Sequence, residues 1–268
     1  MSDFLATMAR VSAERAAAAG PFTAAQFDKP VAPLRLGAFD VIAEIKDRSP
    51  AEGGLTGRGV DRATRAHHYV DGGAAAISVL TEPSRFDGSL EHLEEVAVAV
   101  NGTPVMRKDF LVDPAQVLEA RAAGASGVLL IAAMLDDSKL RSMLDCAAEH
   151  GLFVLLESFD EPDLARSSKL LENPADRERA AAGQLLFGVN TRNLRTLHVD
   201  PQRLAKLAPA LPAARCVAES GLQDAADAAT VAGLGYRLAL VGTALMRSEK
   251  PAELVAGMRA AGYARFAA

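Results

Sequence analysis

The feature that most constrains the fold is a series of eight short apolar runs, separated by longer segments with helical spacing. The runs are residues 41–45, 75–80, 104–106, 128–131, 153–156, 185–189, 216–218 and 238–241. The segments between them are rich in Ala, Leu and Glu, and their apolar residues recur three or four positions apart. Such alternation favours a parallel sheet, whose strands are buried on both faces and therefore read as continuous apolar runs.

The number of these units favours a closed barrel over an open sheet. Eight of them in a chain of 268 residues fit one (β/α)8 TIM barrel, which takes about 250 residues. A doubly wound open sheet is the alternative, but no GxGxxG fingerprint follows the first run. The sequence therefore predicts an α/β chain with a single barrel as its catalytic domain at residues 39–268, preceded by an N-terminal helical extension at residues 1–38.

The expected extension has the pattern of a helix rather than of a leader. Leu5, Met8 and Ser12, with Phe4 and Val11, lie on one helical stripe. Charged residues interrupt the segment, so it lacks the apolar centre of a signal peptide. No later segment offers about 18 uninterrupted apolar residues, which a membrane-spanning helix needs. We expect the extension to pack across the barrel mouth, and a partner subunit is the alternative contact for its apolar stripe.

Charge and cysteine content exclude several classes of partner. The formal net charge is -5 and no Lys/Arg-rich run is present, which argues against nucleic acid. Cys146 and Cys216 stand far apart, so neither a disulfide framework nor a CxxC site is expected, and a cytoplasmic location is favoured. The five histidines lack metal-ligand spacing. We expect a monomer or weak homodimer with no metal, cofactor or membrane partner.

Polar and charged residues stand at the ends of seven of the eight runs. They are Glu44 and Lys46, Thr81 and Glu82, Arg107 and Lys108, Glu157, Asn190 and Arg192, Glu219 and Ser220, and Gly242 and Thr243. Strands that simply stop at a turn would favour Asp, Asn, Ser and Gly over repeated Glu, Lys and Arg. In a (β/α)8 barrel these ends meet at one rim, so the series predicts a single pocket.

Strand alternation places two parts of this series inside the barrel. Glu44 and Lys46 share a face with Ile42, and Glu157 shares one with Leu155. A surface ion pair is the alternative for Glu44 and Lys46. A carboxylate at the end of so apolar a run is costly unless it is paired or functional.

Charges also flank Lys108 after the third run. Arg107 and Asp109 on either side of it mix cations with an acid, which proton-transfer chemistry can use. Solvated loop charges explain Arg107 and Asp109 equally well.

Two glycines follow the seventh and eighth runs. Gly221 comes after Glu219 and Ser220, and Gly242 comes before Thr243. Barrel enzymes often bind phosphate at this part of the rim, through backbone N–H groups that glycine lets the ligand approach closely. Both glycines together predict a phosphorylated small-molecule substrate.

The motifs resemble those of the indole-3-glycerol-phosphate synthase family, in the family's order. They are 41–46 with Ser49-Pro50, 77–83 with Phe86, Gly88 and Ser89, 104–110, 190–194, 218–221 and 240–247. The resemblance runs from about Phe39 to Arg247. The second and third motifs are the most specific.

The resemblance implies conversion of 1-(2-carboxyphenylamino)-1-deoxyribulose 5-phosphate to indole-3-glycerol phosphate, carbon dioxide and water. Lys108 would be the general acid that protonates the ribulose carbonyl, and Lys46 would hold the substrate carboxylate and take part in the acid chemistry. Glu157 and Glu44 would accept or position protons during dehydration. The implied binding residues are Ser49, Asn190, Arg192, Glu219 and Ser220, with Gly221, Gly242 and Thr243 near the phosphate. We further expect the charge of Lys46 to lower the pKa of Lys108 and ease release of its proton.

The chain departs from the family pattern in three places. Ala51-Glu52-Gly53 follows Ser49-Pro50 where the family has Ser-Lys-Gly, and the glycines after it predict a mobile loop over the pocket. Ser158-Phe159 replaces Val-His, and segment 167–183 is longer than in the family. These departures are compatible with a paralogue that acts on a related substrate. A phosphate-binding barrel enzyme of another class and a non-catalytic homologue are also compatible with the sequence.

Overall fold

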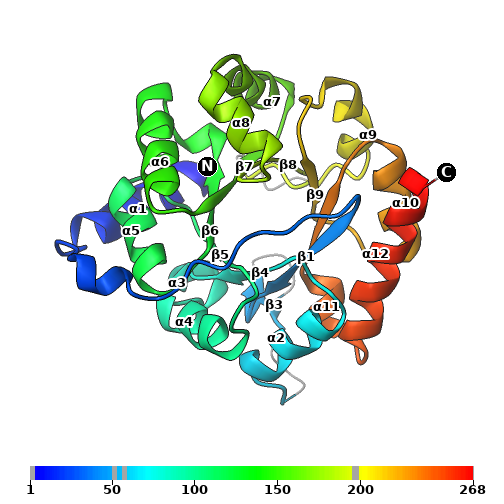
Figure 1. The fold of residues 1–268 in the computed structure, drawn as a ribbon, viewed down its shortest axis with the longest axis horizontal. Coiled ribbons are helices and arrows are strands. Elements are labelled where there is room, and N and C mark those ends of the chain that lie inside the picture. Colours follow the sequence, from blue (N-terminus) through cyan, green and yellow to red (C-terminus); the bar gives the residue numbers. More distant parts are fainter. Residues whose placement is uncertain (1–3, 50–52, 56–58, 195–198, 268) are drawn as a thin grey trace.

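A computed structural model describes residues 4–49, 53–55, 59–194 and 199–267. Eight parallel strands close into a barrel in the order β1-β4-β5-β6-β7-β8-β9-β10, which confirms the predicted (β/α)8 fold. The strands are β1 (Asp40–Ile45), β4 (Ala76–Leu80), β5 (Val105–Lys108), β6 (Gly127–Ile131), β7 (Phe153–Ser158), β8 (Leu185–Asn190), β9 (Cys216–Glu219) and β10 (Leu238–Val241). Each strand overlaps one of the eight apolar runs. Figure 1 shows them as a ring in the middle of the molecule with helices around it.

Helices connect the strands on the outside of the barrel. The longer ones are α2 (Arg62–Asp71), α4 (Leu90–Ala99), α5 (Pro114–Ala122), α6 (Asp137–Glu149), α7 (Glu161–Ser168), α8 (Pro174–Ala181), α10 (Ala225–Gly233) and α12 (Pro251–Ala267). Shorter elements are α3 (Pro83–Phe86), α9 (Arg203–Leu207), α11 (Thr243–Arg247) and the hairpin β2 (Arg48–Ser49) and β3 (Gly53–Gly54). Asp61 caps α2 by accepting a hydrogen bond of 2.7 Å from the Thr64 N–H.

Alternation along the strands divides the buried residues into two apolar layers. Side chains such as Ile42, Met106, Leu155 and Val217 fill the inside of the barrel and pack against one another. The alternate side chains point outward and pack beneath the helices. The barrel is therefore a packed core, as in other (β/α)8 barrels, and its chemistry is confined to the rim.

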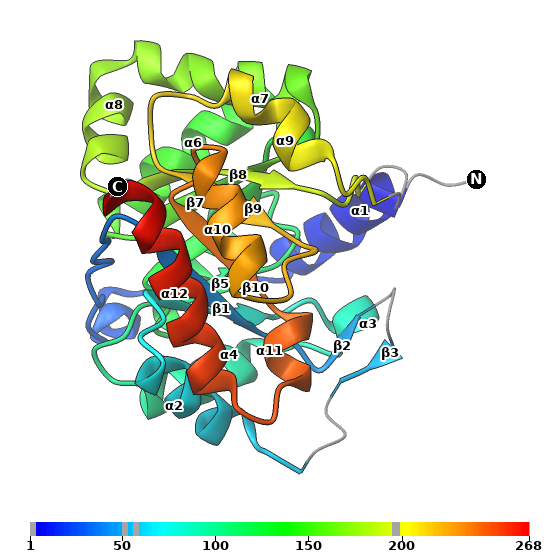
Figure 2. The same ribbon diagram turned by 90° about the vertical axis from the view of Figure 1, so that its right-hand side faces the viewer.

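The N-terminal helix α1 (Phe4–Ala17) lies at the carboxyl ends of the strands. Its predicted stripe is buried at Leu5 and Met8, which pack with Phe110 and the interior cluster. The Arg15 guanidinium holds Asp109, beyond the end of β5, through two hydrogen bonds of 2.7 and 2.8 Å. Figure 2 shows α1 on the same side of the molecule as β2 and β3.

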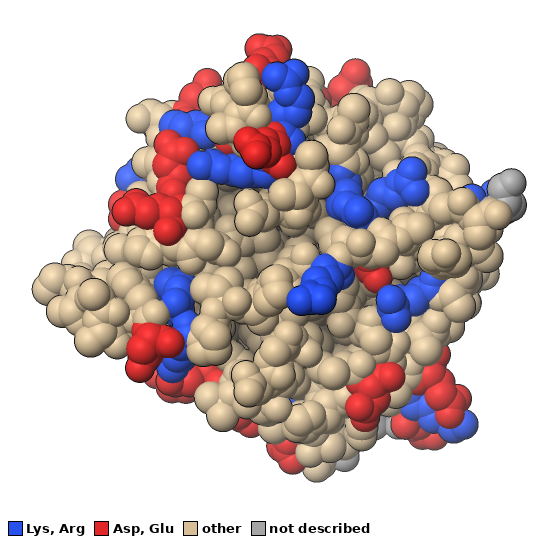
Figure 3. Space-filling model, viewed as in Figure 1, with Lys and Arg blue, Asp and Glu red and all other residues tan. Residues whose placement is uncertain are grey.

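The linker between α1 and β1 crosses the opposite end of the barrel. Leu34 and Leu36 pack against the interior cluster from that end. The Ala32 N–H donates to the Ser126 hydroxyl at 2.9 Å, and the Arg215 guanidinium donates to the Gly37 carbonyl at 2.7 Å. Figure 3 shows this face, on which positive and negative side chains are interspersed. Of the helices within the described residues, none is both long and apolar enough to span a membrane.

Candidate active site

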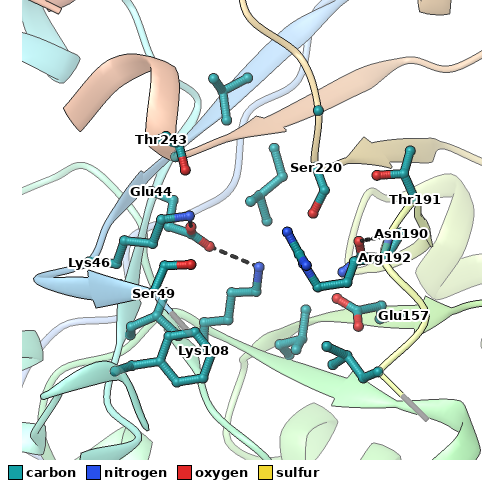
Figure 4. Close-up of a pocket in the computed structure, with 18 of the residues that line it drawn as sticks. Glu44, Lys46, Ser49, Lys108, Glu157, Asn190, Thr191, Arg192, Ser220 and Thr243 are labelled. Atoms are coloured by element: carbon teal, nitrogen blue, oxygen red, sulfur yellow. Dashed lines mark hydrogen bonds and ion pairs between the residues drawn. The ribbon is translucent and has the colours of Figure 1, made fainter. Parts of the chain in front are cut away.

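A pocket of about 430 Å³ opens at the carboxyl ends of the strands. Its lining includes eleven of the twelve predicted site residues: Glu44, Lys46, Ser49, Lys108, Glu157, Asn190, Arg192, Ser220, Gly221, Gly242 and Thr243. The twelfth, Glu219, is fully buried, and one of its carboxylate oxygens lies 3.8 Å from the Lys108 ammonium. Figure 4 shows how the labelled side chains converge on this space.

Four charged residues form the uppermost interior layer of the barrel. Glu44, Lys108, Glu157 and Glu219 come from β1, β5, β7 and β9, which are alternate strands of the ring. Layers of four side chains from alternate strands are the packing unit of this fold. Here one layer is ionic, so three carboxylates and an ammonium group are brought to the floor of the pocket.

Glu44 bridges the two lysines of the pocket. One of its oxygens accepts a hydrogen bond of 2.8 Å from Lys108, and the other lies 2.9 Å from the Lys46 nitrogen. Burial alone would raise the pKa of Glu44, but the charges of Lys108 and Lys46 lower it to about 2. Glu44 therefore contributes stability that is complete above its unfolded value of 4.5 and is lost as the pH falls towards about 2.

The prediction that the pKa of Lys108 is lowered by Lys46 is wrong. Burial lowers the pKa of Lys108, but the carboxylates of Glu44, Glu219 and Glu157 outweigh it and raise the pKa above the usual 10.5. The Glu44 carboxylate is hydrogen-bonded to the Lys108 ammonium and ion-paired with Lys46. Lys108 is consequently a firmly protonated ammonium group.

Glu219 and Glu157 form a buried pair of acids. Burial raises the pKa of Glu219 well above 4.5, and the neighbouring Glu157 carboxylate raises it further, against the opposing effect of Lys108. Neither oxygen of Glu219 has a hydrogen-bond partner among the described residues, nor has Oε1 of Glu157. A neighbouring carboxylate makes ionisation of Glu219 more costly, which is why it adds to the effect of burial on the pKa of Glu219. The pocket floor thus combines one carboxyl group of raised pKa, Glu219, with one of lowered pKa, Glu44.

Arg107 and Asp109 anchor Lys108 from the outside of the barrel. Solvated loop charges, one of the two interpretations of their sequence, are excluded, because each residue is only 2% exposed. Arg107 donates to the Gln116 carbonyl at 2.8 Å and to the Glu119 carboxylate at 2.9 Å. Asp109 is held from α1, so the strand end that carries Lys108 is fixed on both sides.

The far wall of the pocket follows β8 and β9. The side-chain oxygen of Asn190 accepts a hydrogen bond of 2.9 Å from the Arg192 N–H. Figure 4 shows the Arg192 side chain reaching into the pocket towards Lys108. Ser220 and Gly221 adopt φ values of 67° and 82°, a left-handed turn that is unfavourable for a side chain at Ser220. Strained backbone of this kind is found at ligand sites.

An apolar wall completes the pocket, and sequence reasoning gave its residues no role. Phe86, Phe110, Leu129 and Ile131 line it. The ring centres of Phe110 and Phe86 are 6.2 Å apart, and Phe4 of α1 meets Phe110 edge to face at 5.8 Å. Phe86 and Phe110 belong to the second and third motifs, so their place in those motifs was the available signal.

Comparison with known sequences places this geometry in a family. A family model described as indole-3-glycerol phosphate synthase matches residues 10–258. An indole-3-glycerol phosphate synthase from Nocardioides sp. is 47% identical over 223 residues, which is 83% of this chain and 80% of that protein. One from Mycobacterium leprae is 42% identical over 257 residues, covering 96% and 87%. The chain belongs to the indole-3-glycerol phosphate synthase family.

Solved structures outside this synthase family share the fold. A 3-hexulose-6-phosphate synthase from Salmonella typhimurium superimposes with a TM-score of 0.63 at 17% identity, over 85% of this chain and all of that one. An identity this low supports the barrel architecture alone.

The departures from the synthase pattern that the structure describes do not line the pocket. Phe159 is fully buried, and the Ser158 hydroxyl lies 3.2 Å from that of Ser167. The longer segment 167–183 forms α8, whose buried Asp176 is paired with Arg141 and Arg179. None of the described residues that line the pocket comes from this segment. The Ala51-Glu52 exchange lies outside the described residues. Of the predicted mobile loop, Gly53 and Gly54 form β3, while residues 50–52 and 56–58 lie outside the described part of the chain.

Two glycines of this synthase make room for the charged layer. A Cβ on Gly188 would lie 2.0 Å from a Glu219 oxygen, and one on Gly242 would lie 2.3 Å from a Glu44 oxygen. Since Gly242 also lines the pocket, it serves the acid cluster as well as the expected phosphate end. Sequence reasoning did not select Gly188, whose role depends on the neighbouring strand.

Replacing Gly188 with Ala is expected to lower kcat by roughly tenfold, because the new methyl group displaces the Glu219 carboxylate. Steady-state kinetics would measure the effect. Gly257→Ala on α12 is the matched control, since a Cβ there meets no atom within 4 Å. Unchanged kcat in Gly188→Ala would show that the position of Glu219 does not matter.

Replacing Glu219 with Gln is expected to stabilise the folded state at neutral pH. Glu219 titrates near 4.5 when unfolded and well above this when folded. Its native form therefore holds a proton that the unfolded chain releases, and stability falls as the pH rises through that interval. Each unit of pKa difference corresponds to about 1.4 kcal/mol.

The variant removes this titration. We expect its Tm to exceed that of the parent at about pH 8, and by less at about pH 5. Calorimetry at both pH values measures the difference, with the exposed Glu253→Gln as control. An equal gain at both pH values would contradict the raised pKa.

Proposed function

We propose that the chain converts 1-(2-carboxyphenylamino)-1-deoxyribulose 5-phosphate to indole-3-glycerol phosphate, carbon dioxide and water, as a step of tryptophan biosynthesis. The observation that carries the proposal is the Lys46–Glu44–Lys108 bridge on the pocket floor, beside the Glu157 and Glu219 acids. Carbonyl addition needs a proton donor, and dehydration needs a donor and an acceptor. Membership of the synthase family supports the same reaction.

The two ends of the substrate match two sides of the pocket. Backbone N–H groups near Gly221, Gly242 and Thr243 would bind the phosphate, since glycine permits close approach of its oxygens. The aromatic ring would lie against the apolar wall formed by Phe86 and Phe110. This arrangement stretches the ribulose chain across the charged layer.

Cations at the pocket edge would hold the ring carboxylate. Lys46, Arg192 and Ser49 line the part of the pocket on either side of Lys108. Arginine and lysine donate charge-assisted hydrogen bonds to carboxylates. Holding the carboxylate keeps the ring carbon that bears it close to the ribulose carbonyl, which lowers the entropic part of the barrier.

Lys108 would act as the acid in ring closure. The carbonyl oxygen gains negative charge as the ring carbon attacks the carbonyl carbon, and it becomes a far stronger base than the Glu44 carboxylate. The raised pKa of Lys108 ensures that its proton is present when substrate arrives. Transfer of that proton yields the hydroxyl group, and loss of carbon dioxide then restores the conjugation of the ring.

Glu157 and Glu219 would serve the final dehydration. The raised pKa of Glu219 favours its protonated form, so Glu219 would protonate the leaving hydroxyl while Glu157 would accept a ring proton. Glu44 would keep the two lysines in place throughout. Because one barrel supplies all these groups, we also propose that a monomer or weak homodimer is active.

Incubation with the anilino-ribulose phosphate tests the proposal. Indole absorbance and released carbon dioxide should rise together, and the gene should complement a tryptophan auxotroph that lacks this step. A phosphate-binding barrel with another activity would leave the substrate unchanged or isomerise it without releasing carbon dioxide. Binding without any turnover would indicate a non-catalytic homologue.

A further inference from the structure

After β8 the chain forms a short backbone pairing beside the pocket, between residues 191–192 and 199–200, which we call the neck. Arg192 and Val199 form an isolated antiparallel bridge, and both residues line the pocket. The Asp200 N–H donates to the Thr191 carbonyl at 3.0 Å. The neck therefore holds Arg192 at the pocket edge.

Arg203 on α9 fastens this neck from outside the pocket. Its guanidinium donates to the Asn190 carbonyl at 3.1 Å and to the Thr191 carbonyl at 2.6 Å. These are the two peptide groups that immediately precede Arg192. Arg203 itself is not among the described residues that line the pocket.

The backbone of Thr191, between Asn190 and Arg192, is thus hydrogen-bonded through both its N–H and its carbonyl group. The Thr191 N–H donates to the Glu219 carbonyl of β9 at 3.0 Å, while its carbonyl receives the bonds from Asp200 and Arg203. The Asn190 side chain then accepts from the Arg192 N–H. Loss of the Arg203 guanidinium removes the bond to the Asn190 carbonyl and the shorter of the two bonds to the Thr191 carbonyl.

We propose that Arg203 is a positioning residue for substrate binding, which acts by holding the Arg192 guanidinium where it meets the ring carboxylate. This inference rests on the proposed function, since it takes Arg192 as a substrate ligand. One terminal nitrogen of the guanidinium donates both bonds. A guanidinium suits the task because its planar group fixes the directions of the N–H donors, which a freely rotating ammonium group on a flexible stem does not. Arg203 touches neither substrate nor reacting atoms.

Kinetics of single and double variants test the proposal. Arg203→Met is expected to raise KM about fivefold to tenfold and to change kcat by less than about twofold. Arg203→Lys should retain part of the effect and show an intermediate KM. In an Arg192→Met background, Arg203→Met should raise KM no further, because residues that act through one another are not additive.

Arg215→Met is the matched control. Arg215 also donates to a backbone carbonyl, that of Gly37, but at the opposite end of the barrel. It should leave KM unchanged. A role of Arg203 in stability alone would lower Tm without moving KM, or would give additive effects with Arg192→Met, and either result overturns the proposal.

The test separates the inference from the function on which it rests. If Arg192→Met raises KM but neither Arg203 variant does, only the positioning role of Arg203 is wrong. If Arg192→Met leaves KM unchanged, the assignment of Arg192 as a substrate ligand fails, and the inference fails with it.

Discussion

Replacing Lys108 with Met is expected to lower kcat for indole formation by about three orders of magnitude, because a general acid contributes roughly 10²- to 10⁴-fold. Met keeps much of the length of the side chain but removes the proton donor together with the positive charge that pairs with Glu44. Lys46, whose charged group lies 2.9 Å from the other oxygen of Glu44, is held away from the position that Lys108 occupies. Substrate would still bind through its phosphate and ring, so KM should change far less than kcat.

Single-turnover measurements locate the defect. Ring closure and carbon dioxide release should both slow, since closure precedes decarboxylation. Lys250→Met, at an exposed lysine that pairs with Glu253, is the matched control and should keep the parental rate. Unchanged ring closure in Lys108→Met would place the acid elsewhere, and Lys46→Met would then be the variant to compare.

Replacing Glu157 with Gln is expected to lower kcat by roughly a hundredfold, through loss of the proton acceptor in dehydration. The amide fits the same space, so the barrel should remain folded. Ring closure and carbon dioxide release should continue in a single turnover, with the later dehydration becoming slow. Glu253→Gln provides the exposed control.

The same variant has an independent signature at Glu219. The Glu157 carboxylate is the second largest cause of the raised pKa of Glu219, after burial. The neutral amide in Glu157→Gln should therefore lower the pKa of Glu219 while leaving it buried. Carbon-13 NMR titration of glutamate-labelled protein measures this shift, and a pKa that stays where it was would show that the two carboxyl groups do not interact.

Much of the barrel could be predicted because its strands are buried on both faces. Runs such as 153–156 and 185–189 are apolar without interruption, and each became a strand. Alternation along one strand also predicted that Glu44, Lys46 and Glu157 face inward. Both inferences use only residues that are close together in the sequence.

Features that depend on neighbouring strands were beyond this reasoning. The depth of Glu219 and the need for Gly188 beside it follow from the pairing of β8 with β9. The pKa of Lys108 follows from carboxylates on three other strands, which is why an expectation based on Lys46 alone had the wrong sign. Arg203 lies well beyond the strand end that it holds, and none of the sequence motifs includes it.

The packed interior below the charged layer also governs how molecules leave. Ile42, Met106 and Leu155 are fully buried, and the linker covers the far end, so in the part of the chain that the structure describes no passage runs through the barrel. Carbon dioxide formed on the pocket floor must leave past the bound intermediate, through the same opening by which the substrate enters the pocket. Carbon dioxide and the indole product therefore leave through the same opening. Carbon dioxide has to leave first, while the larger intermediate is still bound.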